Sequence, residues 1–134
     1  MPELTGFSHL ALTISDLDRS KPWYVDVLGW QPMFEDTDEH GIRFAFGFFA
    51  GGVGLGLRQH PRGGAGGGGF SPDRAGLDHA SFSVASRADL EAWERHLADK
   101  GATYSPIVDM DYGAVLSFKD PDGIALEVFA MPGT

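Results

Sequence analysis

Apolar residues recur at every second position in several short runs of this chain, which is the spacing of half-buried strands. The clearest run places Ile42, Phe44, Phe46 and Phe48 on one face and predicts a strand over residues 42–49. Further strands are expected at residues 6–14, 30–34, 53–59, 77–84, 104–108, 115–119 and 124–129.

Two longer stretches have the helical spacing instead. The first helix begins at Ser15 or Asp16, either of which can cap it, and ends at Gly29. The second spans residues 86–100 and is followed by Gly101. Ser86 opens it in a pattern close to a capping box. The predicted order is therefore strand, helix and three strands, twice over.

The two halves also repeat each other in sequence. Gly6-Phe7-Ser8-His9 resembles Gly76-Leu77-Asp78-His79, with the histidines 70 residues apart (79 − 9). Leu126-Glu127-Val128 follows Leu55-Gly56-Leu57 by 71 residues (127 − 56). Because half a chain of this length is marginal for a core of its own, the halves are expected to pair. We predict one α+β domain, residues 1–134, made of two βαβββ modules (6–60 and 76–130) and a glycine-rich linker (61–75).

Composition limits the classes of partner. Ten basic residues against 19 acidic ones give a net charge of −9, which disfavours nucleic acid as the main partner. No apolar run approaches the roughly 20 residues of a membrane span. The chain has no cysteine, which excludes disulfides and fits a reducing compartment. We expect a cytoplasmic protein with a small-molecule partner.

The repeat singles out three side chains that can bind a metal. His9 and His79 open equivalent strands, and Glu127 lies in the last strand. If the pseudo-twofold axis runs through the concave surface, the three side chains can converge. Two imidazoles and one carboxylate form a facial triad for a divalent ion such as Fe(II), Mn(II), Ni(II), Co(II) or Zn(II).

The same residues also have plainer interpretations. A single histidine in an apolar strand is usually a hydrogen-bonded core residue. Glu127 is costly to bury without a partner, and strand alternation can equally turn it toward solvent. His40 and His96 are interpreted as loop or surface residues.

Several motifs together are similar to those of one family, the vicinal oxygen chelate superfamily. They are Phe7–Leu12, Trp23-Tyr24 with Leu28-Gly29, Leu77-Asp78-His79, and the turn Asp120-Pro121-Asp122-Gly123 before Leu126-Glu127. Members include glyoxalase I, bleomycin-resistance proteins, extradiol dioxygenases, methylmalonyl-CoA epimerase and fosfomycin-resistance enzymes. The resemblance implies a cupped mixed sheet, the metal triad, a homodimer, and lyase, isomerase or dioxygenase chemistry on a small molecule with vicinal oxygens.

One position departs from that family. Glyoxalase I and the epimerase carry Glu or Gln where this chain has Gly56, so a base must come from elsewhere. Besides Glu127, His60 and Tyr112 are the candidate catalytic groups. Candidate substrate-binding residues are Arg58, Phe46 and Phe48. The plainer alternatives are a solvated arginine, a loop histidine and phenylalanines that form core.

Two other functions stay open at this point. The first is a metal-free binding module of the bleomycin-resistance kind, which sequesters a cationic drug in an acidic, aromatic-lined groove. The second is a structural or sensory relative in which the three ligands are a remnant. The three candidate ligands favour an enzyme, and Gly56 favours the remnant.

Overall fold

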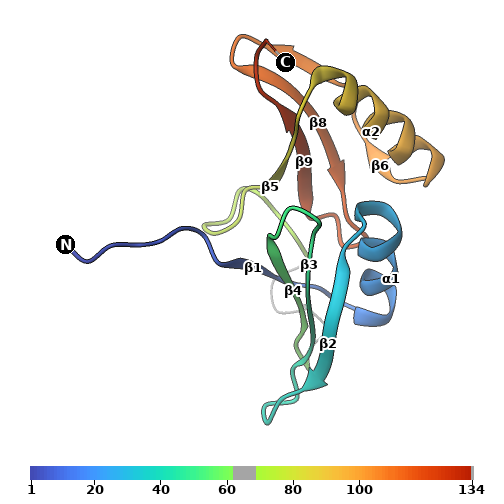
Figure 1. Ribbon diagram of the computed structural model, residues 1–134. Coiled ribbons are helices and arrows are strands. Elements are labelled where there is room, and N and C mark those ends of the chain that lie inside the picture. The colour runs from blue at the N-terminus through green and yellow to red at the C-terminus, as the bar shows by residue number, and fades with distance from the viewer. Residues whose placement is uncertain (62–68, 134) are drawn as a thin grey trace. The chain divides into compact units, whose positions relative to one another are not determined.

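Each half of the chain forms one mixed sheet with one helix packed on it (Figure 1). The structure is a computed structural model that describes residues 1–61 and 69–133. It divides into a first unit, Met1–Gly68, and a second unit, Gly69–Thr134. The predicted α+β class and the two modules are confirmed. Most of the predicted linker, residues 62–68, lies outside the described residues.

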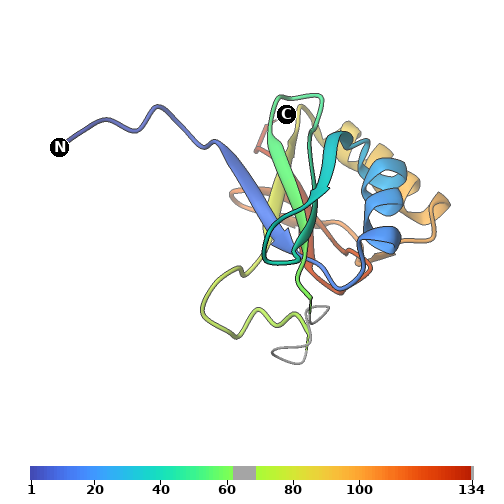
Figure 2. The same ribbon diagram turned by 90° about the horizontal axis from the view of Figure 1, so that it is seen from below.

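The first unit has one helix and a four-stranded sheet. Its elements are β1 (His9–Thr13), α1 (Leu17–Leu28), β2 (Gln31–Thr37), β3 (Arg43–Phe48) and β4 (Gly54–Gln59). The strand order is β1-β4-β3-β2, and β1 runs parallel to β4 while the other pairs are antiparallel. The residues before β1 extend outward from it (Figure 2).

The second unit repeats this plan with one additional strand. Its elements are β5 (Ala80–Val84), α2 (Arg87–Asp99), β6 (Thr103–Tyr104), β7 (Val108–Met110), β8 (Gly113–Lys119) and β9 (Ala125–Ala130). Strand β5 runs parallel to β9, and β8 pairs with β9, β6 and β7. No helix in the described residues is long and apolar enough to cross a membrane.

The single strand predicted over residues 104–108 is wrong. The chain forms β6 and β7 instead, and the residues between them include Pro106. Proline has no N–H group to donate across a sheet, so pairing stops there. The N–H of Ile107 donates to Glu94 Oε1 on α2, at 3.3 Å, rather than to a strand.

The strand register confirms the internal repeat. In the first unit Ala11 on β1 is paired with Gly56 on β4. In the second unit Ser81 on β5 is paired with Glu127 on β9. Gly56 therefore holds the position in its module that Glu127 holds in the other. The segments that lead into β1 and β5 match as well, since Gly6 and Gly76 share a φ of 141°. This conformation favours glycine.

Side-chain caps fix the start of each helix. Of the two candidates for α1, Asp16 is the cap, and its Oδ1 accepts from the N–H of Asp18 at 3.0 Å. Gln59 Oε1 accepts from the N–H of Leu17 at 2.7 Å and so ties the end of β4 to this helix start. Ser86 caps α2 as predicted.

The two faces of each sheet differ in burial. The face toward the helix carries the core: Leu12, Ala45, Leu55 and Leu57 with Leu17 and Tyr24 of α1, and Leu116, Phe118, Leu126 and Val128 with Leu90 and Leu97 of α2. Residues at the alternate positions lie on the opposite side, which we call the helix-free face. In the first unit it carries His9, Phe44, Phe46, Phe48, Gly54, Gly56 and Arg58.

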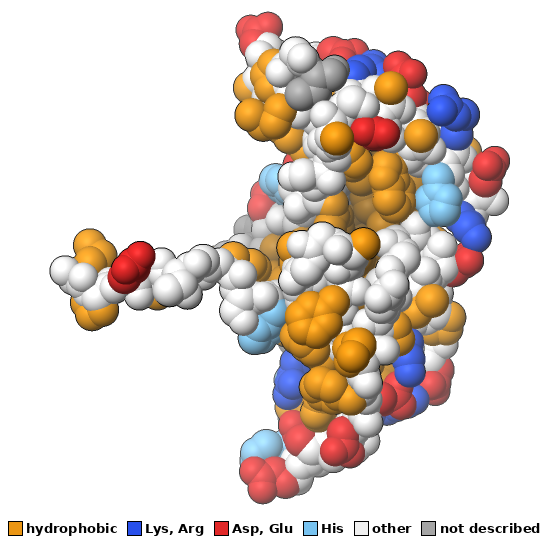
Figure 3. Space-filling view, in the orientation of Figure 1, with side chains coloured by type: hydrophobic (Ala, Val, Ile, Leu, Met, Phe, Trp, Pro, Cys, Tyr) orange, Lys and Arg blue, Asp and Glu red, His pale blue; other side chains and the backbone are white. Residues whose placement is uncertain are grey.

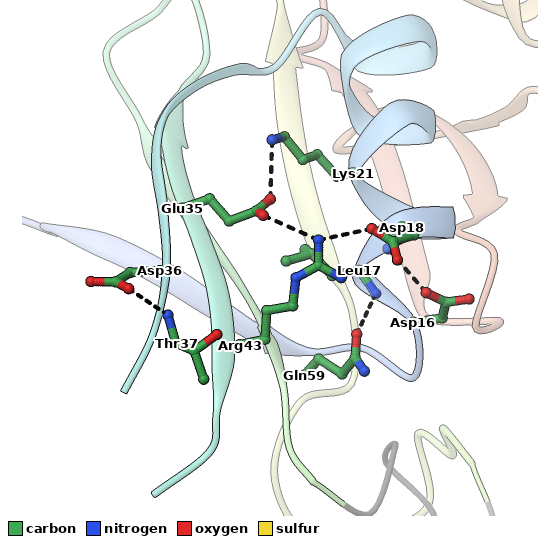
Figure 4. A network of polar contacts seen from close by, with 9 residues as sticks. All are labelled: Asp16, Leu17, Asp18, Lys21, Glu35, Asp36, Thr37, Arg43 and Gln59. Atoms are coloured by element: carbon green, nitrogen blue, oxygen red, sulfur yellow. Dashed lines mark hydrogen bonds and ion pairs between the residues drawn. The ribbon is translucent and has the colours of Figure 1, made fainter. Parts of the chain in front are cut away.

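A polar network joins α1 to the strands of the first unit (Figure 4). Arg43 Nη2 donates to Asp18 Oδ1 at 2.8 Å and to Glu35 Oε2 at 3.1 Å. Lys21 Nζ donates to Glu35 Oε1 at 3.1 Å. The hydrogen bond from Arg43 lowers the pKa of Asp18, and those from Lys21 and Arg43 lower the pKa of Glu35.

We expect Arg43→Met to reduce stability at neutral pH and to have little effect in acid. Carboxyl groups whose pKa is lowered on folding stabilise the native state above their unfolded pKa, and this contribution is lost as the pH falls through the folded value. The difference in Tm between wild type and variant should therefore shrink below about pH 4. Thermal unfolding followed by circular dichroism at pH 7, 5, 4 and 3 tests this, and a difference independent of pH would contradict it.

Two glycines of β4 allow an aromatic ring to lie on the sheet. A Cβ added to Gly54 would lie 2.9 Å from Phe46 Cζ and 3.0 Å from His9 Cβ. A Cβ added to Gly56 would make ordinary contacts of 3.6 Å with Ala11 Cβ and Phe46 Cδ2. The ring of Phe46 therefore lies over both positions, and Gly54 is the tighter of the two.

We predict that Gly54→Ala displaces Phe46 and His9, whereas Gly56→Ala is accommodated. Overpacking at position 54 should cost about 1 kcal/mol or more, and Gly56→Ala should change stability by less than about 0.5 kcal/mol. Chemical denaturation measures both values, and the ring resonances of Phe46 and His9 report the displacement. Equal effects of the two substitutions would show that Phe46 does not lie as described.

Candidate functional site

His79 lies between two carboxylates in the second unit. Its Nδ1 is 2.6 Å from Oδ1 of Asp78, the preceding residue. Its Nε2 is 3.4 Å from Oε1 of Glu127 on β9. The parallel register explains the second contact, because Glu127 is paired with Ser81, two residues after His79. The side chain of Glu127 is 19% exposed and that of His79 is 46% exposed, so solutes can reach the pair.

The two carboxylates determine the electrostatics of the imidazole. The hydrogen bond with Asp78 is the main cause that raises the pKa of His79, and the charge of Glu127 adds to it. Partial burial of the ring opposes both effects. The site therefore attracts positive charge, whether a proton or a cation.

The spacing of His79 and Glu127 suits two ligands of one metal ion. Metal–nitrogen and metal–oxygen distances are about 2.1 Å, so two ligands at a right angle lie about 3.0 Å apart. The separation of 3.4 Å between Nε2 and Oε1 is close to this value. Ser81 and Ser117, the partners of Glu127 on either side of β9, have small side chains. The residues therefore fit a divalent ion.

His9, the third expected ligand, belongs to the first unit, and each unit is described on its own. Ser8 Oγ is 2.9 Å from Nδ1 of His9. The rings of His9 and Phe46 are nearly perpendicular, with their centroids 5.4 Å apart. Within residues 1–61 and 69–133, no group of three or more His, Asp or Glu side chains is gathered as a metal site. The structure thus brings together two of the three expected ligands.

An aromatic cluster covers the helix-free face of the first unit. We define it as Phe34, Phe44, Phe46 and Phe48. Phe46 stacks on Phe34 at 5.8 Å and meets Phe48 edge-on at 5.3 Å, and Phe34 meets Phe44 at 6.1 Å. Figure 3 shows hydrophobic side chains gathered over the strands of this unit.

This cluster is not core, which was the plainer interpretation of these phenylalanines. Phe34 is 55% exposed and Phe48 is 42% exposed. The buried positions of β3 are instead Ala45 and Gly47. A Cβ at Gly47 would come within 2.6 Å of Pro32 Cα, so the sheet has no room for a larger side chain there.

Arg58 lies at the end of the aromatic cluster. Its guanidinium carbon is 5.3 Å from the centroid of Phe44, a cation–π distance. Its Nη2 is 3.5 Å from Oδ2 of Asp38. The guanidinium group thus contacts a ring and a carboxylate, while the side chain stays 37% exposed. Its substrate-binding role stays a prediction.

The other two candidate catalytic groups are His60 and Tyr112. His60 follows the end of β4 and is half-buried in the first unit. Tyr112 lies in the turn between β7 and β8 and is 67% exposed. In the described part of the chain, no hydrogen bond joins Tyr112 to His79 or Glu127. Their catalytic roles stay predictions.

Sequence reasoning missed three residues that the structure places at these sites. Asp78 and Ser8 engage the two histidines, and Phe34 stacks on Phe46. Asp78 and Ser8 could have been found from the sequence, because each half of the repeat has a polar residue directly before its histidine. Phe34 gave no comparable signal within its short, proline-containing edge strand.

Known proteins similar to this chain share its fold over nearly its whole length. A biphenyl-2,3-diol 1,2-dioxygenase of Rhodococcus globerulus is 31% identical over 138 residues, which cover 93% of this chain and 65% of that protein. The chain thus spans just under two thirds of that relative.

Solved structures agree with the sequence comparison. A glyoxylase/bleomycin resistance protein/dioxygenase domain from Frankia sp. EAN1pec is 40% identical, with a TM-score of 0.87 and coverage of 96% of this chain and 99% of the other. A mutant of the fosfomycin resistance protein FosX from Listeria monocytogenes, complexed with Mn(II) and 1S,2S-dihydroxypropylphosphonic acid, shares the fold, with 16% identity, a TM-score of 0.72 and coverage of 98% and 96%.

A family model settles the relationship that the sequence motifs indicated. The model of the Glyoxalase/Bleomycin resistance protein/Dioxygenase superfamily matches residues 6–128. The chain therefore belongs to this superfamily.

Proposed function

We propose that this protein is a metal-dependent enzyme that acts on a small molecule with two adjacent oxygen atoms. His9, His79 and Glu127 are the proposed metal ligands. The observation that carries this proposal is the 3.4 Å separation of His79 Nε2 and Glu127 Oε1, with Asp78 behind the imidazole. The Mn(II) complex of the FosX mutant and the dioxygenase relative support it.

Two imidazoles and one carboxylate accept Fe(II), Mn(II), Ni(II), Co(II) or Zn(II), and leave open positions for two substrate oxygens. A bound ion would act as a Lewis acid and stabilise negative charge that develops on those oxygens. Glu127 contributes the single carboxylate of the set. Gly56, its counterpart in the repeat, contributes no side chain.

Among the possible reactions, we favour dioxygenase chemistry on an aromatic diol over lyase or isomerase chemistry. A glyoxalase-type proton transfer lacks a base at position 56. The aromatic cluster provides an apolar surface that begins at the ring of His9, and Arg58 can bind an anionic substituent. The relative at 31% identity is named for an aromatic diol. His60 and Tyr112 are the proposed acid–base partners, and the homodimer is also proposed.

A metal-free binding module is the second candidate function. The exposed rings of Phe34 and Phe48, together with a net charge of −9, favour it because they suit a cationic aromatic drug. The two functions differ in whether the protein binds a stoichiometric metal ion.

We predict about one transition-metal ion per chain in protein purified without a histidine tag or chelator. His9→Ala, His79→Ala and Glu127→Ala should each reduce the metal content, because each removes one of three ligands. His40→Ala is the matched control, since His40 is an exposed histidine in the turn before β3. Inductively coupled plasma mass spectrometry gives both the amount and the identity of the metal.

Two results would overturn this assignment in different ways. If His9→Ala and His79→Ala both keep stoichiometric metal, the ligand set is wrong. If the wild type binds no ion even after reconstitution with Fe(II), Mn(II), Ni(II) and Zn(II), the binding module becomes the better interpretation.

A second prediction concerns the aromatic cluster. Phe48→Ala should weaken binding of catechol about tenfold, because losing part of the burial of one phenyl ring corresponds to about 1.4 kcal/mol. Val25→Ala is the control, since Val25 is an apolar residue of α1 with 42% exposure, like Phe48. Isothermal titration calorimetry measures both affinities. Equal affinities of Phe48→Ala and wild type would exclude Phe48 from the binding surface.

A further inference from the structure

The two histidines occupy equivalent positions of the repeat, yet their hydrogen-bond partners differ. In both units, the Nδ1 atom of the histidine contacts the side chain of the preceding residue. The partner of His79 is the Asp78 carboxylate at 2.6 Å, and the partner of His9 is the Ser8 hydroxyl at 2.9 Å. The shorter contact is the charge-assisted one.

These partners have different consequences for the tautomer of each ring. An ionised carboxylate only accepts hydrogen bonds, so Asp78 requires the proton of neutral His79 to be on Nδ1. The lone pair of His79 is then on Nε2, which faces Glu127. A hydroxyl group can donate or accept, so Ser8 leaves both tautomers of His9 accessible.

The two modules also differ in the number of carboxylates around their histidines. The second unit provides two carboxylates, Asp78 and Glu127, around His79. The equivalent positions of the first unit, Ser8 and Gly56, provide none. Apart from Ser8, His9 is contacted by the ring of Phe46, which is neutral. A divalent cation is thus attracted mainly by the second unit.

We infer that Asp78 is a positioning residue that holds the proton of His79 on Nδ1, so that Nε2 can bind the metal ion. His79 and Glu127 then bind the ion tightly, and we call them the tight half of the metal site. His9 is the exchangeable ligand, which contributes less to the affinity. This inference rests on the proposed function. A hydrogen-bond partner of this kind behind a metal-binding histidine orients the ring and increases its basicity, and its loss usually costs 10- to 100-fold in metal affinity.

The first test uses the metal-free, full-length protein. At pH 9, well above the unperturbed imidazole pKa of about 6.5, ¹⁵N chemical shifts distinguish the two tautomers. We expect wild-type His79 to carry its proton on Nδ1, and Asp78→Ala to move a substantial part of the population to Nε2. Asp78→Asn should restore the wild-type tautomer, because an amide oxygen still accepts from Nδ1. An unchanged tautomer in Asp78→Ala would overturn the positioning role.

The second test measures affinity for Zn(II) and Co(II) by competition with a chromophoric chelator. Asp78→Ala should weaken binding about 10- to 100-fold and Ser8→Ala, its matched control, about threefold or less. His79→Ala should abolish binding, whereas His9→Ala should leave measurable affinity. Asp78 and Ser8 are both exposed, and thermal unfolding verifies that each variant folds.

The outcomes separate this inference from the proposed function. If wild type binds metal but Ser8→Ala costs as much as Asp78→Ala, or His9→Ala costs as much as His79→Ala, the division into a tight half and an exchangeable ligand is wrong. If wild type binds no ion, the proposed function and this division fail together. The tautomer measurement still decides the role of Asp78 in that case.

Discussion

The parallel pairing of the first and last strand in each module is the constraint on which the candidate site depends. A parallel pair needs a long crossover connection, and α1 and α2 begin that connection in the two modules. In the second unit this pairing places Glu127 opposite Ser81, two residues beyond His79, although 48 positions separate the histidine from the glutamate (127 − 79). The 3.4 Å contact between them follows from this register rather than from any local turn.

The second constraint is that each sheet has a helix on one face only. Only the face toward the helix carries the core of each unit, and the larger side chains need not lie on that face. In β3 the helix side carries Ala45 and Gly47, because the close approach of β2 leaves Gly47 no room for a Cβ. The phenylalanines take the alternate positions, and the glycines of β4 let Phe46 lie over the sheet, edge-on to His9. The same packing that builds the first unit thus brings an apolar surface up to a candidate metal ligand.

These features mark what the sequence could and could not predict. Alternation and the repeat predicted the strands, both helices and the equivalence of Gly56 and Glu127, because periodicity and spacing are properties of the chain itself. Alternation alone does not say which face of β3 meets the helix, so the phenylalanines were open to interpretation as core. The division of residues 104–108 into two strands depends on Pro106 and on the hydrogen bond from Ile107 to Glu94, a contact between distant residues. The roles of Asp78 and Ser8 depend on side-chain rotamers, which no spacing rule gives.

The second module has Glu127 where the first has Gly56, and this difference has a simple electrostatic interpretation. Two carboxylates close together repel each other, and one of them tends to retain a proton. In the proposed metal site, a glutamate at position 56 would add a second anionic ligand to Glu127 and cancel the charge of a divalent ion, whereas Glu127 alone would leave the ion and its ligands with a net positive charge. A positive centre favours a substrate whose oxygens become negative during the reaction. Gly56 is then compatible with the proposed metal site, because the missing carboxylate would leave a bound ion its positive charge.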